Sequence, residues 1–105
     1  MQGLDVEIEY TSKSVQNILE HFFHFQHSAE NGNMDALILI ADMKVATKKV
    51  KLTEQQKRVY YCRFLREYTV EEVAEVMCIS HQAVSRLIER IVAKIVKVLN
   101  GEELR

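Results

Sequence analysis

The chain contains no proline and only three glycines among its 105 residues. Turn-rich β folds need these residues to reverse the chain, whereas helices tolerate their absence. A hydrophobic fraction of 48% is ordinary for a globular protein and argues against general disorder. We therefore expect an all-α fold of about five helices, small enough for one compact domain or for two helical lobes that share a core.

Capping residues and apolar periodicity place the helices. Two are expected from about residue 11 to 30 and from about 34 to 49, and three more begin at Thr53, Thr69 and Ser80. Residues 4–10 follow another pattern, because apolar side chains there alternate with acidic ones, as in a half-buried strand. This segment is predicted to be either a short β arm or a loose acidic arm.

The most informative stretch runs from Leu52 to Lys97 and contains a short helix, a three-residue turn and a longer helix. Ala74 supplies a small side chain where the second helix would cross the first. Apolar residues occupy the positions that a three-helix core needs, namely Val73, Met77, Ile79, Val84 and Leu87. This pattern predicts a helix-turn-helix whose second helix enters the major groove of DNA.

The polar side chains of this second helix are of types that recognise DNA. Gln82 can pair with adenine, Arg86 with guanine, and Ser85 with a base or a phosphate. Basic residues recur every fourth position from Arg86 and can follow a phosphate backbone, although such a row is also typical of a solvated surface. The predicted contact set is Thr69, Ser80, His81, Gln82, Ser85, Arg86, Arg90 and Lys94.

Several motifs in this stretch resemble region 4 of bacterial sigma factors. They are Leu52-Thr53-Glu54, Tyr68 to Ala74, Ile79-Ser80 and Val84-Ser85-Arg86. The chain is also similar to short sigma-like regulators encoded by phages and prophages. The resemblance implies promoter DNA and RNA polymerase as partners. It assigns Thr69 to a phosphate, and bases and backbone to His81, Gln82, Ser85, Arg86 and Arg90.

Two features depart from that family. Cys78 stands in the turn where the family usually has glycine, and a non-glycine residue in the left-handed conformation costs about 1 kcal/mol. In addition, nothing in the first 50 residues resembles a promoter-melting region. A self-sufficient sigma factor is therefore not expected.

Other kinds of site receive little support. His21, His24 and His27 recur at steps of three and offer a conceivable zinc site, but an exposed polar face is the more common origin of such spacing. Cys62 and Cys78 form no recognisable zinc motif or disulfide framework. With no catalytic motif, signal sequence or membrane-length apolar run, we expect no enzymatic activity, metal or cofactor, and a cytoplasmic location away from membranes.

The distribution of charge divides the chain into two parts, and its surplus of apolar surface indicates an interface. Residues 1–50 hold four Lys/Arg and seven Asp/Glu, whereas residues 51–105 hold ten and eight. The first part is predicted to be an arm and a helical pair for dimerisation or partner binding, and the second part the DNA-binding domain. The last helix has an apolar stripe widened by Val92 and Val96. It favours a homodimer joined through the amino-terminal helices, unless those helices fold back and bury the stripe within one chain.

The function predicted from the sequence is a sequence-specific transcriptional regulator that binds double-stranded DNA. Two alternatives stay open. One is the DNA-recognition small subunit of a phage packaging terminase, because such subunits also carry helix-turn-helix modules. The other is a protein-interaction module that sequesters a transcription factor.

Overall fold

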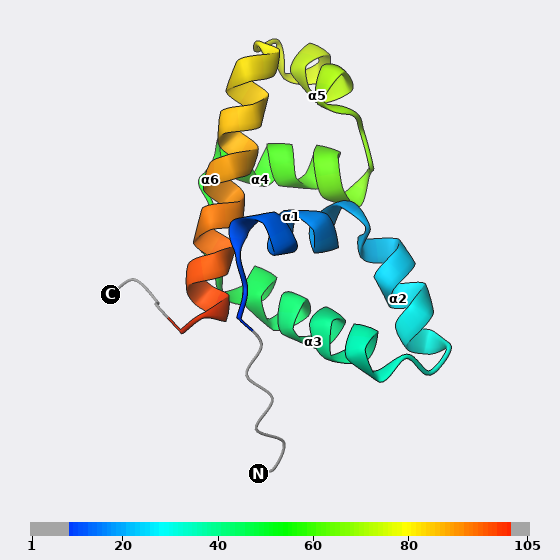
Figure 1. The fold of residues 1–105 in the computed structure, drawn as a ribbon. Helices are drawn as coiled ribbons and strands as arrows, with labels where there is room; N and C mark the ends of the chain where they lie inside the picture. The colour runs from blue at the N-terminus through cyan, green and yellow to red at the C-terminus, as the bar shows by residue number, and fades with distance from the viewer. Residues whose placement is uncertain (1–8, 102–105) are drawn as a thin grey trace.

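The structure is a computed structural model, and it describes residues 9–101 (Figure 1). Its elements are α1 (Ser12–Glu20), α2 (Phe22–Glu30), α3 (Met34–Lys49), α4 (Glu54–Tyr60), the π-helical turn η1 (Tyr61–Leu65), α5 (Val70–Met77) and α6 (His81–Leu99). Between residues 9 and 101 there is no strand, which agrees with the all-α class. Most of the predicted β arm lies outside the described residues.

The helix count is higher than the prediction in two places. The expected first helix is divided at His21, whose backbone leaves the helical conformation at φ −119° and ψ 30°. The division lets α1 pack on α6 while α2 packs on α3, which one straight helix cannot do (Figure 1). The helix that follows Thr53 changes to a π turn, closed by the Arg66 N–H donating to the Tyr61 carbonyl at 2.9 Å.

The long helix α6 is the central element of the fold. It contacts α4 and α5 as well as α1 and α3. Its buried side chains are Val84, Leu87, Ile88, Ile91, Val92 and Ile95. One hydrophobic core therefore joins the two parts of the chain, with Val15 and Met43 from the first part meeting Val59 and Val73 from the second.

This packing overturns the reason for expecting a dimer from the α6 stripe. The amino-terminal helices fold back over α6, so Val92 is 1% exposed and Ile95 is fully buried within one chain. A dimer has to be argued from another surface.

The amino-terminal segment is tied to both ends of this core. Tyr10 is 5% exposed, and its hydroxyl donates to Asp42 Oδ2 on α3 at 2.6 Å. Its carbonyl accepts from Asn100 Nδ2, just beyond α6, at 3.2 Å. Burial and the bond to Asp42 raise the pKa of Tyr10 well above its ordinary value. The phenol therefore stays neutral and keeps donating across the working range of pH.

Candidate nucleic-acid interface

Both helices of the predicted motif begin at side-chain caps. Thr69 Oγ1 accepts from the Glu72 N–H at 3.1 Å, and Glu72 Oε1 accepts from the Thr69 N–H at 2.8 Å. This pair is the capping box that the sequence predicted. Ser80 Oγ accepts from the Ala83 N–H at 3.0 Å and so fixes the start of α6. The first turn of α6 therefore begins at His81, as expected.

The turn between the two helices has the backbone that the family's glycine would supply. Cys78 is left-handed, with φ 57° and ψ 44°, and ends α5. The following Ile79 N–H donates back to the Ala74 carbonyl at 3.0 Å. Met77 and Ile79 pack against the core on either side of Cys78. These contacts offset a strain of about 1 kcal/mol at a non-glycine residue.

The crossing of α5 and α6 follows the predicted register. Ala74 is 5% exposed, while Val73 and Val84 are fully buried. Leu87 is also buried in this core, and Ile79 packs against it. The small side chain at Ala74 leaves room for α6 to approach α5 closely, and this contact sets the angle at which the exposed side of α6 is presented.

Five of the predicted contact residues lie together on the exposed side of the first turns of α6. They are His81, Gln82, Ser85, Arg86 and Arg90, and all are exposed. Helical spacing places them away from the buried Val84, Leu87 and Ile88. Within residues 9–101 none of the five side chains has a hydrogen-bond or ion-pair partner, so they are available to an external ligand.

Glu89 belongs to the same surface and was missed from the sequence. It is exposed and follows Ser85 by four residues and Arg86 by three, which places it beside them on the helix. A carboxylate here repels phosphate but accepts from the N4 amino group of cytosine. Its signal in the sequence was this helical spacing.

Lys94 points elsewhere, which corrects the predicted basic row. Its Nζ donates to Gln56 Oε1 at 2.8 Å and to the Lys51 carbonyl at 3.0 Å. Gln56 is 6% exposed and also holds the Thr53 N–H in the cap of α4. Lys94 thus fastens α6 to the start of α4. The exposed Lys97 takes its place in a row with Arg86 and Arg90.

Exchanging these two lysines for methionine separates their roles. Lys94→Met should lower the free energy of unfolding by about 1–3 kcal/mol, because it removes two charge-assisted hydrogen bonds. Lys97→Met should leave stability unchanged. It should weaken binding to all DNA sequences alike and reduce the salt dependence of that binding by about one phosphate contact. Urea denaturation and salt-dependent DNA titration measure the two effects, and the reverse pattern would return Lys94 to the interface.

Thr69 sits at the start of α5, where its hydroxyl can still donate to a phosphate. Its predicted contact stays a prediction, since the same end of α5 is acidic. Glu71, Glu72 and Glu75 line a shallow hollow between α5 and the start of α6, together with His81. These carboxylates disfavour a phosphate in the hollow itself. DNA is therefore expected to approach from the Gln82 and Arg86 side of α6.

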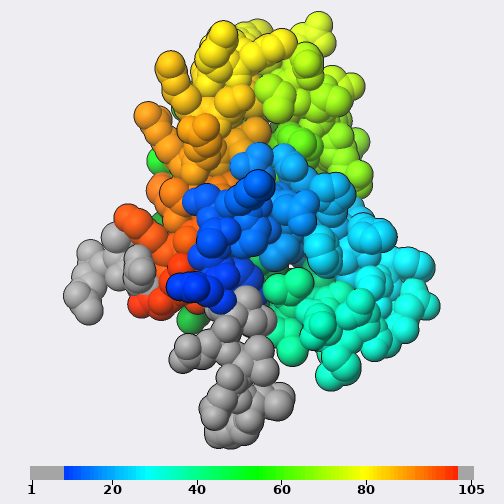
Figure 2. Space-filling model, in the orientation of Figure 1, coloured from blue at the N-terminus to red at the C-terminus, as the bar shows by residue number. Residues whose placement is uncertain are grey.

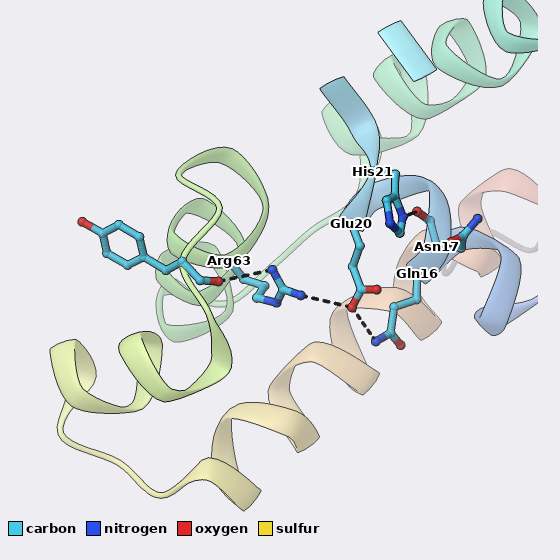
Figure 3. Close-up of polar contacts among 6 residues, drawn as sticks. Gln16, Asn17, Glu20, His21 and Arg63 are labelled. Atoms are coloured by element: carbon cyan, nitrogen blue, oxygen red, sulfur yellow. Dashed lines mark hydrogen bonds and ion pairs between the residues drawn. The ribbon is translucent and has the colours of Figure 1, made fainter. Parts of the chain in front are cut away.

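A polar cluster joins α1 to the module (Figure 3). Arg63 Nη2 lies 3.3 Å from Glu20 Oε2, and Arg63 Nη1 donates to the Tyr68 carbonyl at 3.2 Å. Gln16 Nε2 donates to the same Glu20 oxygen at 3.1 Å. The cluster thus connects α1 to η1 and to the loop before α5. The cluster could not be predicted from the sequence, because Glu20 and Arg63 are 43 positions apart.

The histidines and cysteines considered as metal ligands lie apart from the exposed side of α6 or bond to near neighbours in the chain. His21 Nδ1 bonds to the Asn17 carbonyl at 3.0 Å (Figure 3), and His27 Nε2 lies 3.2 Å from Asn31 Nδ2. Among residues 9–101 no three His, Cys, Asp or Glu side chains are grouped so as to hold a metal ion. Cys62 is half-buried and Cys78 exposed, and both are free thiols. In the same part of the chain no helix combines the length and apolarity that a membrane span requires.

Helices α4, α5 and α6 share one core, and an exposed polar face follows the turn at Cys78. That arrangement is a helix-turn-helix, the module whose second helix commonly enters the major groove of DNA. Residues 50–97 match the family model of sigma-70, region 4, so this part of the chain is a sigma region 4-like helix-turn-helix. The match covers slightly less than half of the chain and agrees with the resemblance to sigma region 4 that the motifs indicated. Neither the curated proteins nor the solved structures gave a significant match.

Proposed function

We propose that the protein is a sequence-specific transcriptional regulator that reads promoter DNA with the first turns of α6. The observation that supports this most is the group of five exposed side chains, His81 to Arg90, that have no partner within residues 9–101. They stand on a capped helix within a match to sigma region 4. Residues 50–97 also carry nine Lys/Arg against six Asp/Glu, which favours an anionic ligand.

In this proposal the contacts are divided along α6. Gln82 and Arg86 face the base edges, where an amide pairs with adenine and a guanidinium with guanine O6 and N7. Ser85 and His81 bind a neighbouring base or phosphate, and Arg90 and Lys97 follow the backbone beyond them. We propose that the protein acts in the cytoplasm, as a binding module and not as an enzyme. We also propose that it is related to the sigma-like regulators of phages.

Selection of bound sequences from random duplex DNA tests the function, followed by titration of the selected duplex over a range of salt. A promoter-like consensus with strong discrimination supports the proposal. Weak or structure-dependent binding would favour a terminase small subunit instead. Absence of DNA binding would favour a module that sequesters a protein partner.

The proposal includes contact with RNA polymerase through a second surface. A groove between α4, η1 and α5 is lined by Lys57, Arg58, Tyr61, Cys62, Val76 and Met77. Tyr61 is 51% and Val76 60% exposed, although both are large apolar or aromatic residues. An apolar floor beside two cationic side chains suits an amphipathic helix with acidic residues at its edge.

Val76→Lys tests this second contact. The substitution places a charge in the groove and is expected to reduce retention of the protein by RNA polymerase at least about tenfold, which is about 1.4 kcal/mol. Because the groove that contains Val76 is lined by residues of α4, η1 and α5 and by none of α6, affinity for the selected duplex should not change. Pull-down with purified polymerase measures the first effect and DNA titration the second. Unchanged retention would remove the groove from the polymerase contact.

A further inference from the structure

Helix α3 is apolar on two opposite sides. Its inner side is buried at Ala36, Ile40, Met43 and Ala46. Its other side carries a second apolar stripe, the outer face of α3, which consists of Met34, Leu37, Ala41 and Val45. Met34 is 65%, Leu37 47% and Val45 53% exposed. A helix that needed only to cover the core would carry polar residues there, so the outer face indicates a partner.

The outer face lies far from the DNA-reading turns. Figures 1 and 2 show α3 at the end of the molecule opposite to α5 and the amino-terminal end of α6. The groove proposed for RNA polymerase is formed by α4, η1 and α5, and it does not include α3. Neither of the two contacts already proposed covers the outer face.

The outer face is complementary to itself. Ala41 lies at its middle, with Leu37 four residues before and Val45 four residues after. If a second α3 packs antiparallel across a two-fold axis at Ala41, the two alanines meet and Leu37 of each copy faces Val45 of the other. The small side chain at the centre allows the two helices to approach closely. This is the self-matching geometry that a two-fold interface requires.

The charges of α3 favour the same arrangement. Asp35 lies in the first turn and Lys48 in the last turn of α3. An antiparallel pair therefore brings the acidic end of each helix to the basic end of the other. It also sets the two helix dipoles side by side and antiparallel, which is favourable. A parallel pair would place the two Lys48 side chains at the same end of the interface.

We propose that two copies of this chain pair through the outer face of α3, antiparallel about Ala41. Pairing at this site leaves both DNA-reading ends free and widely separated. Each copy then binds its own DNA site, and the protein does not span two adjacent half-sites of a palindrome. This last consequence rests on the proposed function, whereas the pairing itself does not need DNA.

Light scattering of the full chain at increasing micromolar concentration, without DNA, tests the pairing. The unmodified protein should approach twice the 12.2 kDa chain mass. Val45→Lys should weaken self-association at least about tenfold, since it places two buried ammonium groups in the interface. Leu65→Lys is the matched control, because it charges a similarly exposed apolar residue on η1, outside both proposed binding surfaces, and should leave pairing unchanged.

A cross-linking experiment locates the axis even if Val45→Lys folds poorly. In a Cys78→Ser background, Ala41→Cys should form a disulfide-linked dimer under mild oxidation, because the two introduced thiols would meet at the axis. Ala93→Cys, exposed on α6, should not do so at the same concentration.

Other outcomes overturn the proposal. A mass of one chain at every concentration would do so, as would pairing that Val45→Lys does not weaken. If deletion of residues 1–8 converted a single chain into a dimer, the occupant of the outer face would be the chain's own amino-terminal segment. If the protein selected a DNA sequence but stayed a single chain, the pairing would be wrong and the proposed function would stand. If it paired but selected no DNA sequence, the proposed function would be wrong and the pairing would stand.

Discussion

Arg86→Ala is expected to weaken binding to the selected duplex by about 1–3 kcal/mol, or about 5- to 150-fold. The reason is that a guanidinium bidentate to guanine supplies two hydrogen bonds that no other side chain on this turn can replace. The preference at a single base pair should disappear while the others are retained. Titration against the selected duplex and its single-base variants measures both effects.

The control for this prediction is Lys97→Ala, further along the same exposed side of α6. It should lower affinity for all duplexes alike and reduce the salt dependence, without changing which base pairs are preferred. If Arg86→Ala gave that uniform pattern as well, Arg86 would bind a phosphate. The base-reading end of the helix would then be confined to Gln82 and its neighbours.

The features predicted well from the sequence are those fixed by residues close together in the chain. The caps at Thr69 and Ser80 depend on side chains that reach amides three residues away, so their spacing alone identifies them. The left-handed turn at Cys78 follows from the positions of the two helices on either side of it. These local features fix where α6 begins, and with it the position of the proposed interface.

The features that were missed depend on contacts between distant residues. The row from Arg86 to Lys94 was drawn from helical spacing, but Lys94 lies next to Gln56, 38 positions away in the chain. The break at His21 arises because α1 and α2 pack on different helices. The choice between an open α6 stripe and a covered one was likewise a matter of tertiary packing, and Val92 and Ile95 are covered within the chain.

Ala74→Leu should damage the fold and not only DNA binding. Ala74 is 5% exposed at the crossing of α5 and α6, beside the fully buried Val73 and Val84. Three additional carbon atoms cannot be placed there without moving one of the helices, so the free energy of unfolding should fall by about 1–3 kcal/mol or more. For a domain of this size each kcal/mol lowers the melting temperature by about 4–8 °C.

The same substitution at an exposed alanine is the control. Ala93→Leu adds the same atoms to the exposed side of α6, where solvent leaves room for them, and stability should change by less than about 0.5 kcal/mol. Urea denaturation of both variants measures the difference. Equal stabilities would show that α5 and α6 do not meet closely at Ala74. The angle of α6, and with it the set of side chains presented to DNA, would then have to be assigned differently.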